Sequence, residues 1–137
     1  MRTALDSNIL SALWSNESSG LRIETELTSA RAMGSIVICG PVYVEVVAHP
    51  LVSLSFVEEF LAATDIEIDF FLDEPILRRA AVGFSAYAQR HRQSGGIAPK
   101  RMLPDFLIAA HALLRADRLM TLDPARYQQD FTELRLV

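Results

Sequence analysis

The chain has 137 residues, of which 50% are hydrophobic and 22% are charged. A chain of this length can bury a sizeable core without disulfides, so we expect one domain over residues 1–137. The single cysteine, Cys39, cannot pair within the chain and favours a reducing compartment. No hydrophobic run reaches the roughly 18 residues of a membrane span, and the first residues lack the hydrophobic stretch of a signal peptide. We therefore expect a cytoplasmic protein with no membrane contact.

The charge is unevenly distributed along the chain. The formal net charge is −4, which by itself argues against a nucleic-acid partner. The segment from Pro75 to Pro104, however, contains six Lys or Arg residues and no acid. A solvated helix face followed by a flexible basic loop would produce the same pattern, so phosphate binding is one of two interpretations. The candidate cations for phosphate contact are Arg90, Arg92, Lys100 and Arg101.

Short β-type runs alternate with longer helical patterns in the first half of the chain. Asp6 is a capping residue for the first helix, Gly34 ends the second helix, and Pro50 blocks the third. The strand from 66 is expected to be more exposed than the others, because hydrophobic and acidic residues alternate in it. The expected strands cover residues 2–5, 35–39 and 66–70, and the expected helices begin at residues 7, 21, 41 and 53.

The second half of the chain continues the alternation. A long helix is expected from Pro75, and glycines 95 and 96 end it in a basic loop. Pro104 restarts the chain as a helix, and Pro124 opens a short helical turn. The expected strands cover residues 118–121 and 133–137. Strands that alternate with helices in this way predict an α/β fold with a largely parallel sheet.

Four acidic residues stand out from this pattern. Asp6 and Asp123 directly follow expected strands, and ligands bind beyond the carboxyl ends of strands in open parallel sheets. Asp105 lies at a helix start, and Glu45 lies in a helix among valines. Each aspartate alone could be a helix cap or a favourable contact with the helix dipole. Glu45 is harder to explain structurally, because a carboxylate among hydrophobic side chains must meet something positive.

Clustered carboxylates repel one another and raise one another's pKa. Such a group is physically reasonable chiefly if a divalent cation neutralises it, and oxygen ligands favour Mg²⁺ or Mn²⁺. The sequence therefore predicts that the four acids converge on a metal site.

The residues around these acids resemble a known family. The stretch Leu5–Asn8 follows the first strand, Tyr43 and Val44 precede Glu45, Asp105 opens a Phe-Leu-Ile-Ala-Ala run, and Thr121-Leu122 precedes Asp123. This order over almost the whole chain resembles a PIN domain, and at this length a VapC-like ribonuclease toxin of a type II toxin–antitoxin system. The resemblance implies a three-layer α/β sandwich with a five-stranded parallel sheet and helices on both faces. It also implies acidic metal-site residues Asp6, Glu45, Asp105 and Asp123, with Asn8 and Thr121 as supporting polar groups.

The chemistry implied by the resemblance is Mg²⁺- or Mn²⁺-dependent hydrolysis of RNA by an endoribonuclease. Water attacks phosphorus and the 3′-oxygen leaves, which agrees with the ability of bound cations to lower the pKa of water and to neutralise phosphate charge. The implied partners are the RNA substrate, a VapB-like antitoxin that inhibits the toxin, and a second copy of the chain in a homodimer.

Two other functions are compatible with parts of the sequence. A catalytically inactive PIN-like module would bind RNA or a protein without cutting, and the complete set of four acids argues against it. An α/β phosphatase or nucleotide-binding domain is poorly supported, because the chain has no Gly-rich phosphate loop and Asn8 stands where such a phosphatase has a second aspartate.

Overall fold

The computed structural model describes all residues from 1 to 137, with the elements in the expected order. The strands are β1 (Thr3–Leu5), β2 (Ile36–Cys39), β3 (Ile66–Asp69) and β4 (Arg118–Met120). The helices are α1 (Ser7–Trp14), α2 (Gly20–Met33), α3 (Gly40–Val46), α4 (Leu54–Ala63), α5 (Glu74–Gln93), α6 (Leu103–Arg115) and α7 (Ala125–Gln128).

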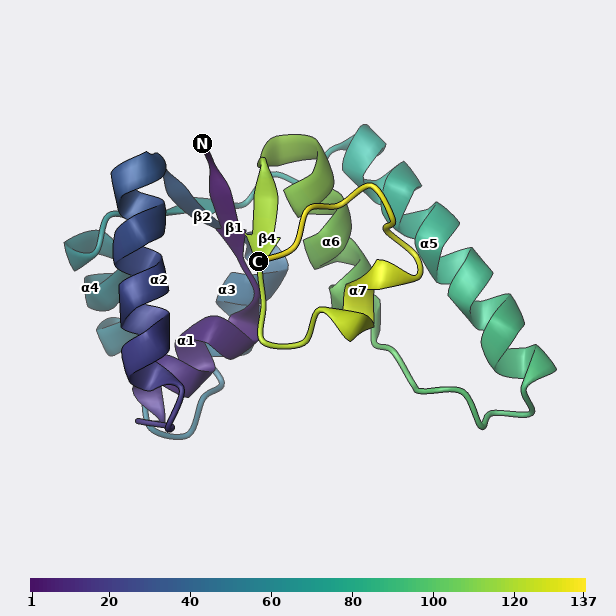
Figure 1. The fold of residues 1–137 in the computed structure, drawn as a ribbon, viewed down its shortest axis with the longest axis horizontal. Coiled ribbons are helices and arrows are strands. Elements are labelled where there is room, and N and C mark those ends of the chain that lie inside the picture. Colours follow the sequence, from purple (N-terminus) through teal and green to yellow (C-terminus); the bar gives the residue numbers. More distant parts are fainter.

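A parallel sheet lies at the centre of the molecule, with its strands in the order β3-β2-β1-β4. Helices lie on both sides of this sheet, with α2 on the nearer side and α3 and α4 on the farther side in Figure 1. All residues of β1, β2 and β4 are buried, as expected for strands that are covered on both faces. The expected α/β architecture is confirmed.

The sheet has four strands, so the expected fifth strand over residues 133–137 is wrong in detail. A turn occupies residues 132–133 and leaves only the last residues free to pair. They run parallel to β4, where the N–H of Val137 donates to the carbonyl of Leu119 at 3.0 Å, but form only an isolated bridge between Leu119 and Leu136. The segment therefore protects the edge of β4 without becoming a strand.

The core is one connected cluster of 29 buried residues around the sheet. Helix α5 packs along α6 and forms the outer side of the molecule in Figure 1. The chain after α7 returns to this pair of helices, where Phe131 is 2% exposed and the Arg79 guanidinium lies 4.3 Å from its ring centre. This packing holds α7 beside the carboxyl end of the sheet.

No helix of the structure has the length and hydrophobicity needed to cross a lipid bilayer.

Candidate acidic active site

Asp6 is the most deeply buried acid of the molecule, with 0% of its surface exposed. It follows β1 directly and caps α1, because its Oδ1 accepts a hydrogen bond of 2.7 Å from the N–H of Ser7. Its Oδ2 accepts hydrogen bonds from the hydroxyls of Thr121 at 2.8 Å and Tyr127 at 2.7 Å. Asp6 is thus both the helix cap that the sequence predicts and a carboxylate at the carboxyl end of the sheet.

Thr121 connects the ends of β1 and β4. Besides donating to Asp6, its Oγ1 accepts from the Nδ2 of Asn8 at 3.3 Å and from the N–H of Asp123 at 3.1 Å. The Oδ1 of Asn8 in turn accepts from the N–H of Leu122 at 3.1 Å. Asn8 and Thr121, expected as supporting polar groups, therefore fix the loop that carries Asp123 against the start of α1.

Asp105 and Asp123 share one cation, Arg126. Pro104 starts α6 and places Asp105 in its first turn, where Oδ2 accepts from the N–H of Met102 at 3.0 Å. Nη1 of Arg126 lies 3.5 Å from Oδ1 of Asp105, and its Nη2 lies 3.4 Å from Oδ2 of Asp123. Asp105 is 8% exposed, whereas the side chain of Asp123 is 43% exposed. The guanidinium therefore neutralises part of the charge of both carboxylates.

Glu45 in α3 faces the same group of acids. Its side chain reaches solvent, yet partial burial and the charges of Asp6 and Asp105 raise its pKa above the ordinary value, while Ser7 and Arg126 oppose the shift. Burial also raises the pKa of Asp105, although the hydrogen bond from Met102 and the charge of Arg126 oppose the rise, and the charge of Asp6 makes a smaller contribution in the same direction as burial. Asp6 therefore lies near enough to Glu45 and Asp105 to disfavour their charged forms.

The donor chemistry of this group suits a hard divalent cation, because all four expected ligands offer carboxylate oxygens. The side chains are not drawn together into a binding site, since no three Asp, Glu, His or Cys side chains lie close enough to hold a metal ion. Hydrogen bonds hold Asp6 in place, and Arg126 draws Asp105 and Asp123 toward itself. The structure thus brings the acids to one end of the sheet without gathering them into a metal cluster.

Tyr127 and Arg126 are site residues that the sequence analysis missed. Tyr127 is 1% exposed, and burial together with the neighbouring charge of Asp6 raises its pKa, so its hydroxyl remains a donor. The signal for Arg126 was present in the sequence, because Pro124 starts a helical turn and residues three apart on a helix are neighbours. The contact from Tyr127 to Asp6 spans 121 residues and had no local signal.

The expected phosphate-binding cations divide into two groups. Arg90 is ion-paired, with Nη1 and Nη2 each 2.8 Å from a carboxylate oxygen of Asp130. Arg92 and Lys100 are exposed, and Arg101 is partly exposed. The charge of Arg101 opposes the rise in the pKa of Asp105, so Arg101 is the member of the set that lies near the acidic site.

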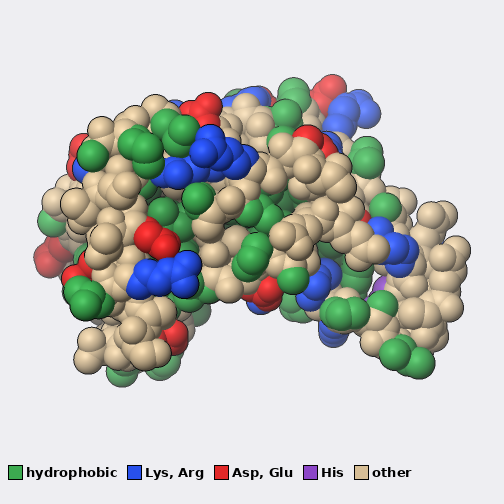
Figure 2. Space-filling view, in the orientation of Figure 1, with side chains coloured by type: hydrophobic (Ala, Val, Ile, Leu, Met, Phe, Trp, Pro, Cys, Tyr) green, Lys and Arg blue, Asp and Glu red, His purple; other side chains and the backbone are tan.

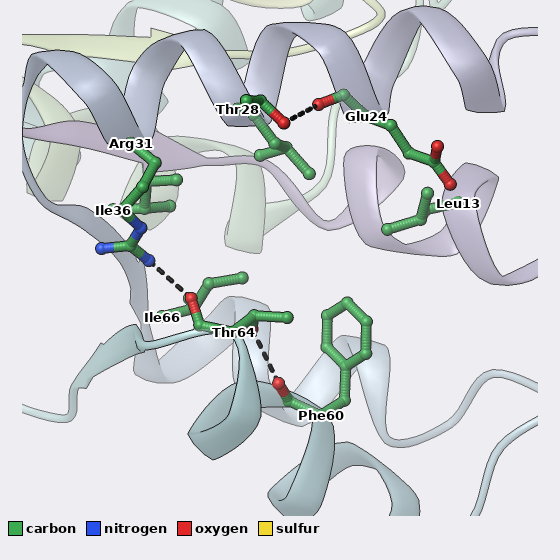
Figure 3. Close-up of a pocket in the computed structure, with 9 residues that line it drawn as sticks. Leu13, Glu24, Thr28, Arg31, Ile36, Phe60, Thr64 and Ile66 are labelled. Atoms are coloured by element: carbon green, nitrogen blue, oxygen red, sulfur yellow. Dashed lines mark hydrogen bonds between the residues drawn. The ribbon is translucent and has the colours of Figure 1, made fainter.

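A separate hollow of about 490 Å³ lies away from the acids. Figure 3 shows its lining between α2 and α4, with Leu13 of α1, Phe60 of α4 and the first residues of β2 and β3, Ile36 and Ile66. Because strands β2 and β3 begin here, the hollow is at the opposite end of the sheet from the carboxylates. Its lining is mainly hydrophobic and contains none of the four acids.

The family profile described as PIN domain matches residues 3–131. Among solved structures, the fold is similar to VapBC-1 from nontypeable Haemophilus influenzae, with a TM-score of 0.66, 20% identity, and coverage of 100% of this chain and 97% of that chain. It is also similar to VapBC2 from Rickettsia felis bound to a DNA fragment from their promoter, with a TM-score of 0.66, 21% identity, and coverage of 100% and 98%. No curated protein matches the chain.

The hydroxyl of Tyr127 stabilises the buried charge of Asp6, so its removal has a predictable cost. We expect Tyr127→Phe to lower the free energy of unfolding by about 1–3 kcal/mol, because a buried carboxylate loses a donor. Tyr43→Phe is the matched control, since the hydroxyl of Tyr43 donates to Glu58 at the surface. It should change stability by less than about 0.5 kcal/mol. Equal urea unfolding curves for the two variants would contradict this role of Tyr127.

Proposed function

Because this chain belongs to the PIN-domain family, we propose that it is a metal-dependent endoribonuclease of the VapC toxin type, acting as a single domain in the cytoplasm. The observation that carries the proposal is that Glu45 and Asp105 lie near the buried Asp6 at the carboxyl end of the sheet, where burial and the charge of Asp6 both raise their pKa. Stability alone gives no reason to place two partly buried carboxylates beside a third whose charge disfavours theirs. A site that binds a divalent cation does give such a reason.

We assign each side chain a part in hydrolysis of the phosphodiester. Asp6, Glu45, Asp105 and Asp123 would hold Mg²⁺ or Mn²⁺, which when bound lowers the pKa of water and neutralises charge on the phosphate. Glu45 is exposed, whereas Asp6 and Asp105 are buried, so Glu45 would orient the attacking water. The new oxygen–phosphorus bond forms as the bond to the 3′-oxygen breaks, so the products carry a 5′-phosphate and a 3′-hydroxyl.

Asn8 and Thr121 would act as positioning residues in this scheme. Thr121 donates to Asp6 and Asn8 ties the Asp123 loop to α1, so both keep acidic side chains in place before a cation arrives. The RNA strand would be attracted by Arg92, Lys100 and Arg101, with Arg90 contributing less because Asp130 already neutralises it.

The alternative proposal is a PIN-like module that binds RNA or a protein without cutting it. One observation favours it: no three acids are close enough together to hold an ion. The two proposals differ in a measurable property, because only the nuclease generates new RNA ends.

Removal of one buried acid tests the nuclease directly. We expect Asp105→Asn to reduce Mn²⁺-stimulated RNA cleavage roughly 100-fold or more, since a lost ligand removes several kcal/mol of charge stabilisation. The amide oxygen can still accept from Met102, so the variant should fold. Asp65→Asn is the control, because Asp65 is 96% exposed at a φ of 56°, which asparagine tolerates.

The assay is gel mapping of RNA ends with melting curves recorded in parallel. New 5′-phosphate ends from the wild type and from Asp65→Asn, but not from Asp105→Asn, support the nuclease. RNA binding without any cleavage by the wild type would establish the alternative module instead.

We also propose a VapB-like antitoxin as partner and a homodimer as the resting assembly. Both solved neighbours are described as VapBC proteins, which supports a partner chain. The hydrophobic hollow between α2 and α4 (Figure 3) is the candidate binding site for a segment of that antitoxin. Its volume is in the range of ligand pockets, and Glu24 and Arg31 on its lining offer both charges to a polar edge of the segment.

Antitoxin binding in this hollow can be tested with two substitutions on α2. Leu27→Glu places a charge in the hollow and should abolish co-purification with an antitoxin encoded beside the chain, while leaving RNA cleavage intact. Leu21→Glu is the control, because Leu21 of α2 is 77% exposed and outside the hollow. Light scattering would read the mass of each assembly. An undiminished complex with Leu27→Glu would move the antitoxin to another surface.

A further inference from the structure

A second, smaller pocket lies beside the acidic site. It has a volume of about 60 Å³ and is lined by the end of α5, the loop before α6, and α7 with the residues that follow it. Arg126 lines this pocket and also contacts Asp105, so the pocket and the acidic site share a wall. In Figure 2, Lys or Arg side chains flank a partly covered histidine on the side where α5 ends and α7 lies.

The pocket contains more positive than negative charge. Arg90, Arg101 and Arg126 line it, against a single carboxylate, that of Asp130. Both oxygens of Asp130 are already engaged by Arg90, and its side chain is 6% exposed. The carboxylate therefore anchors Arg90. The charge of Arg101, and part of the charge of Arg126, which also faces Asp105 and Asp123, can act on whatever enters the pocket.

Two polar side chains of the pocket, His91 and Tyr87, have unused hydrogen-bonding capacity. The Nδ1 atom of His91 is buried and has no hydrogen-bond partner. The hydroxyl oxygen of Tyr87 accepts from the N–H of Arg101 at 2.9 Å, which fixes the loop and leaves the proton of that hydroxyl unused. Buried polar groups are normally paired, so unused donors around a cationic pocket indicate a ligand that accepts hydrogen bonds.

The size of the pocket limits the kind of ligand. The pocket, at about 60 Å³, is far smaller than the hydrophobic hollow of about 490 Å³, so it suits a small group such as a single oxyanion. Arginine is the side chain best suited to phosphate, because its planar fork of donors matches the oxygens of that group. An acidic site beside the pocket repels a polyanionic strand, so a compensating contact next to it has a clear use.

We propose that this pocket is a subsite for one backbone phosphate of a single-stranded RNA, neighbouring the phosphate presented to the acidic site. The inference rests on the proposed ribonuclease function and adds to it a defined contact made by Arg101, His91 and Tyr87. It also gives Arg126 a second use, as the side chain between the two phosphates.

Binding can be measured without cleavage by adding chelator to the intact protein. The probe is a fluorescein-labelled single-stranded oligoribonucleotide, followed by anisotropy over a series of KCl concentrations. We expect Arg101→Gln to weaken binding about tenfold at low salt and to reduce the slope of log K against log salt by about 0.7, the value for one phosphate contact on a single strand. Arg78→Gln is the control, because it makes the same charge change on α5 with a side chain that is 77% exposed and outside the pocket.

A second measurement, NMR of the histidine rings, is specific to the pocket. The chain has three histidines, so the ring resonances of His91 can be assigned by their loss in His91→Gln. Addition of the oligonucleotide should shift these signals in the wild type and in Arg78→Gln, and should shift them less in Arg101→Gln.

The possible outcomes separate this inference from the function on which it rests. If the wild type binds RNA while Arg101→Gln keeps both its affinity and its salt slope, the subsite is wrong and the nuclease proposal stands. If inorganic phosphate shifts the ring signals of His91 but RNA does not, the pocket is a site for a free anion, and the proposed RNA subsite is wrong. If the wild type binds no RNA at all, the proposed function fails together with the subsite.

Discussion

The carboxylate of Asp6 is buried without a lysine or arginine paired to it, and the rest of the acidic site is organised around that charge. Neutral donors satisfy it: the N–H of Ser7 and the hydroxyls of Thr121 and Tyr127. These donors come from three separate elements, so the charge ties β1, the end of β4 and α7 together. A buried charge held only by neutral groups still repels other anions, and this repulsion adds to the effect of burial, which is the main cause of the raised pKa of Glu45 and Asp105.

Arg126 relieves part of the repulsion from the other side of the site. It reaches Asp105 and Asp123 at 3.5 and 3.4 Å, both longer than a close ion pair, while its side chain remains 34% exposed. Because α7 has only four residues, the position of Arg126 depends on the anchoring of Tyr127 and Phe131 in the core. The geometry of the site therefore depends on packing at the end of the chain as well as on the sheet.

The sequence predicted the order of the elements up to the last strand, and it predicted which strand or helix each acid belongs to. Asp6 and Asp123 follow strands and Asp105 opens a helix, which are local signals. Contacts between distant residues were not predictable in the same way. Nothing near Tyr127 indicates that it donates to Asp6, and nothing near Arg90 indicates that Asp130 neutralises it. The prediction of a fifth strand was wrong because residues 132–133 form a turn, and the hydrophobic pattern had placed residue 133 in the strand.

Chain-wide charge was a poor guide for a related reason. The net charge of −4 sums an acidic site and a basic region that lie next to each other. Arg126 lies at their boundary, where it faces Asp105 on one side and the small pocket on the other. For a phosphate chain, this juxtaposition matters more than the sum, because local fields govern binding.

The central claim is that the acids repel one another until a cation joins them, and thermal unfolding of the wild type and Glu45→Gln tests it most directly. Glu45 has a raised pKa in the folded state, so its ionised form weakens folding above that pKa, and the weakening disappears as pH falls toward the ordinary value of 4.5. In chelator at neutral pH, Glu45→Gln should therefore melt at a higher temperature than the wild type, and the two should converge in acid. Added Mn²⁺ should raise the melting temperature of the wild type more than that of the variant. Equal melting temperatures in chelator, with no response of the wild type to Mn²⁺, would contradict the account.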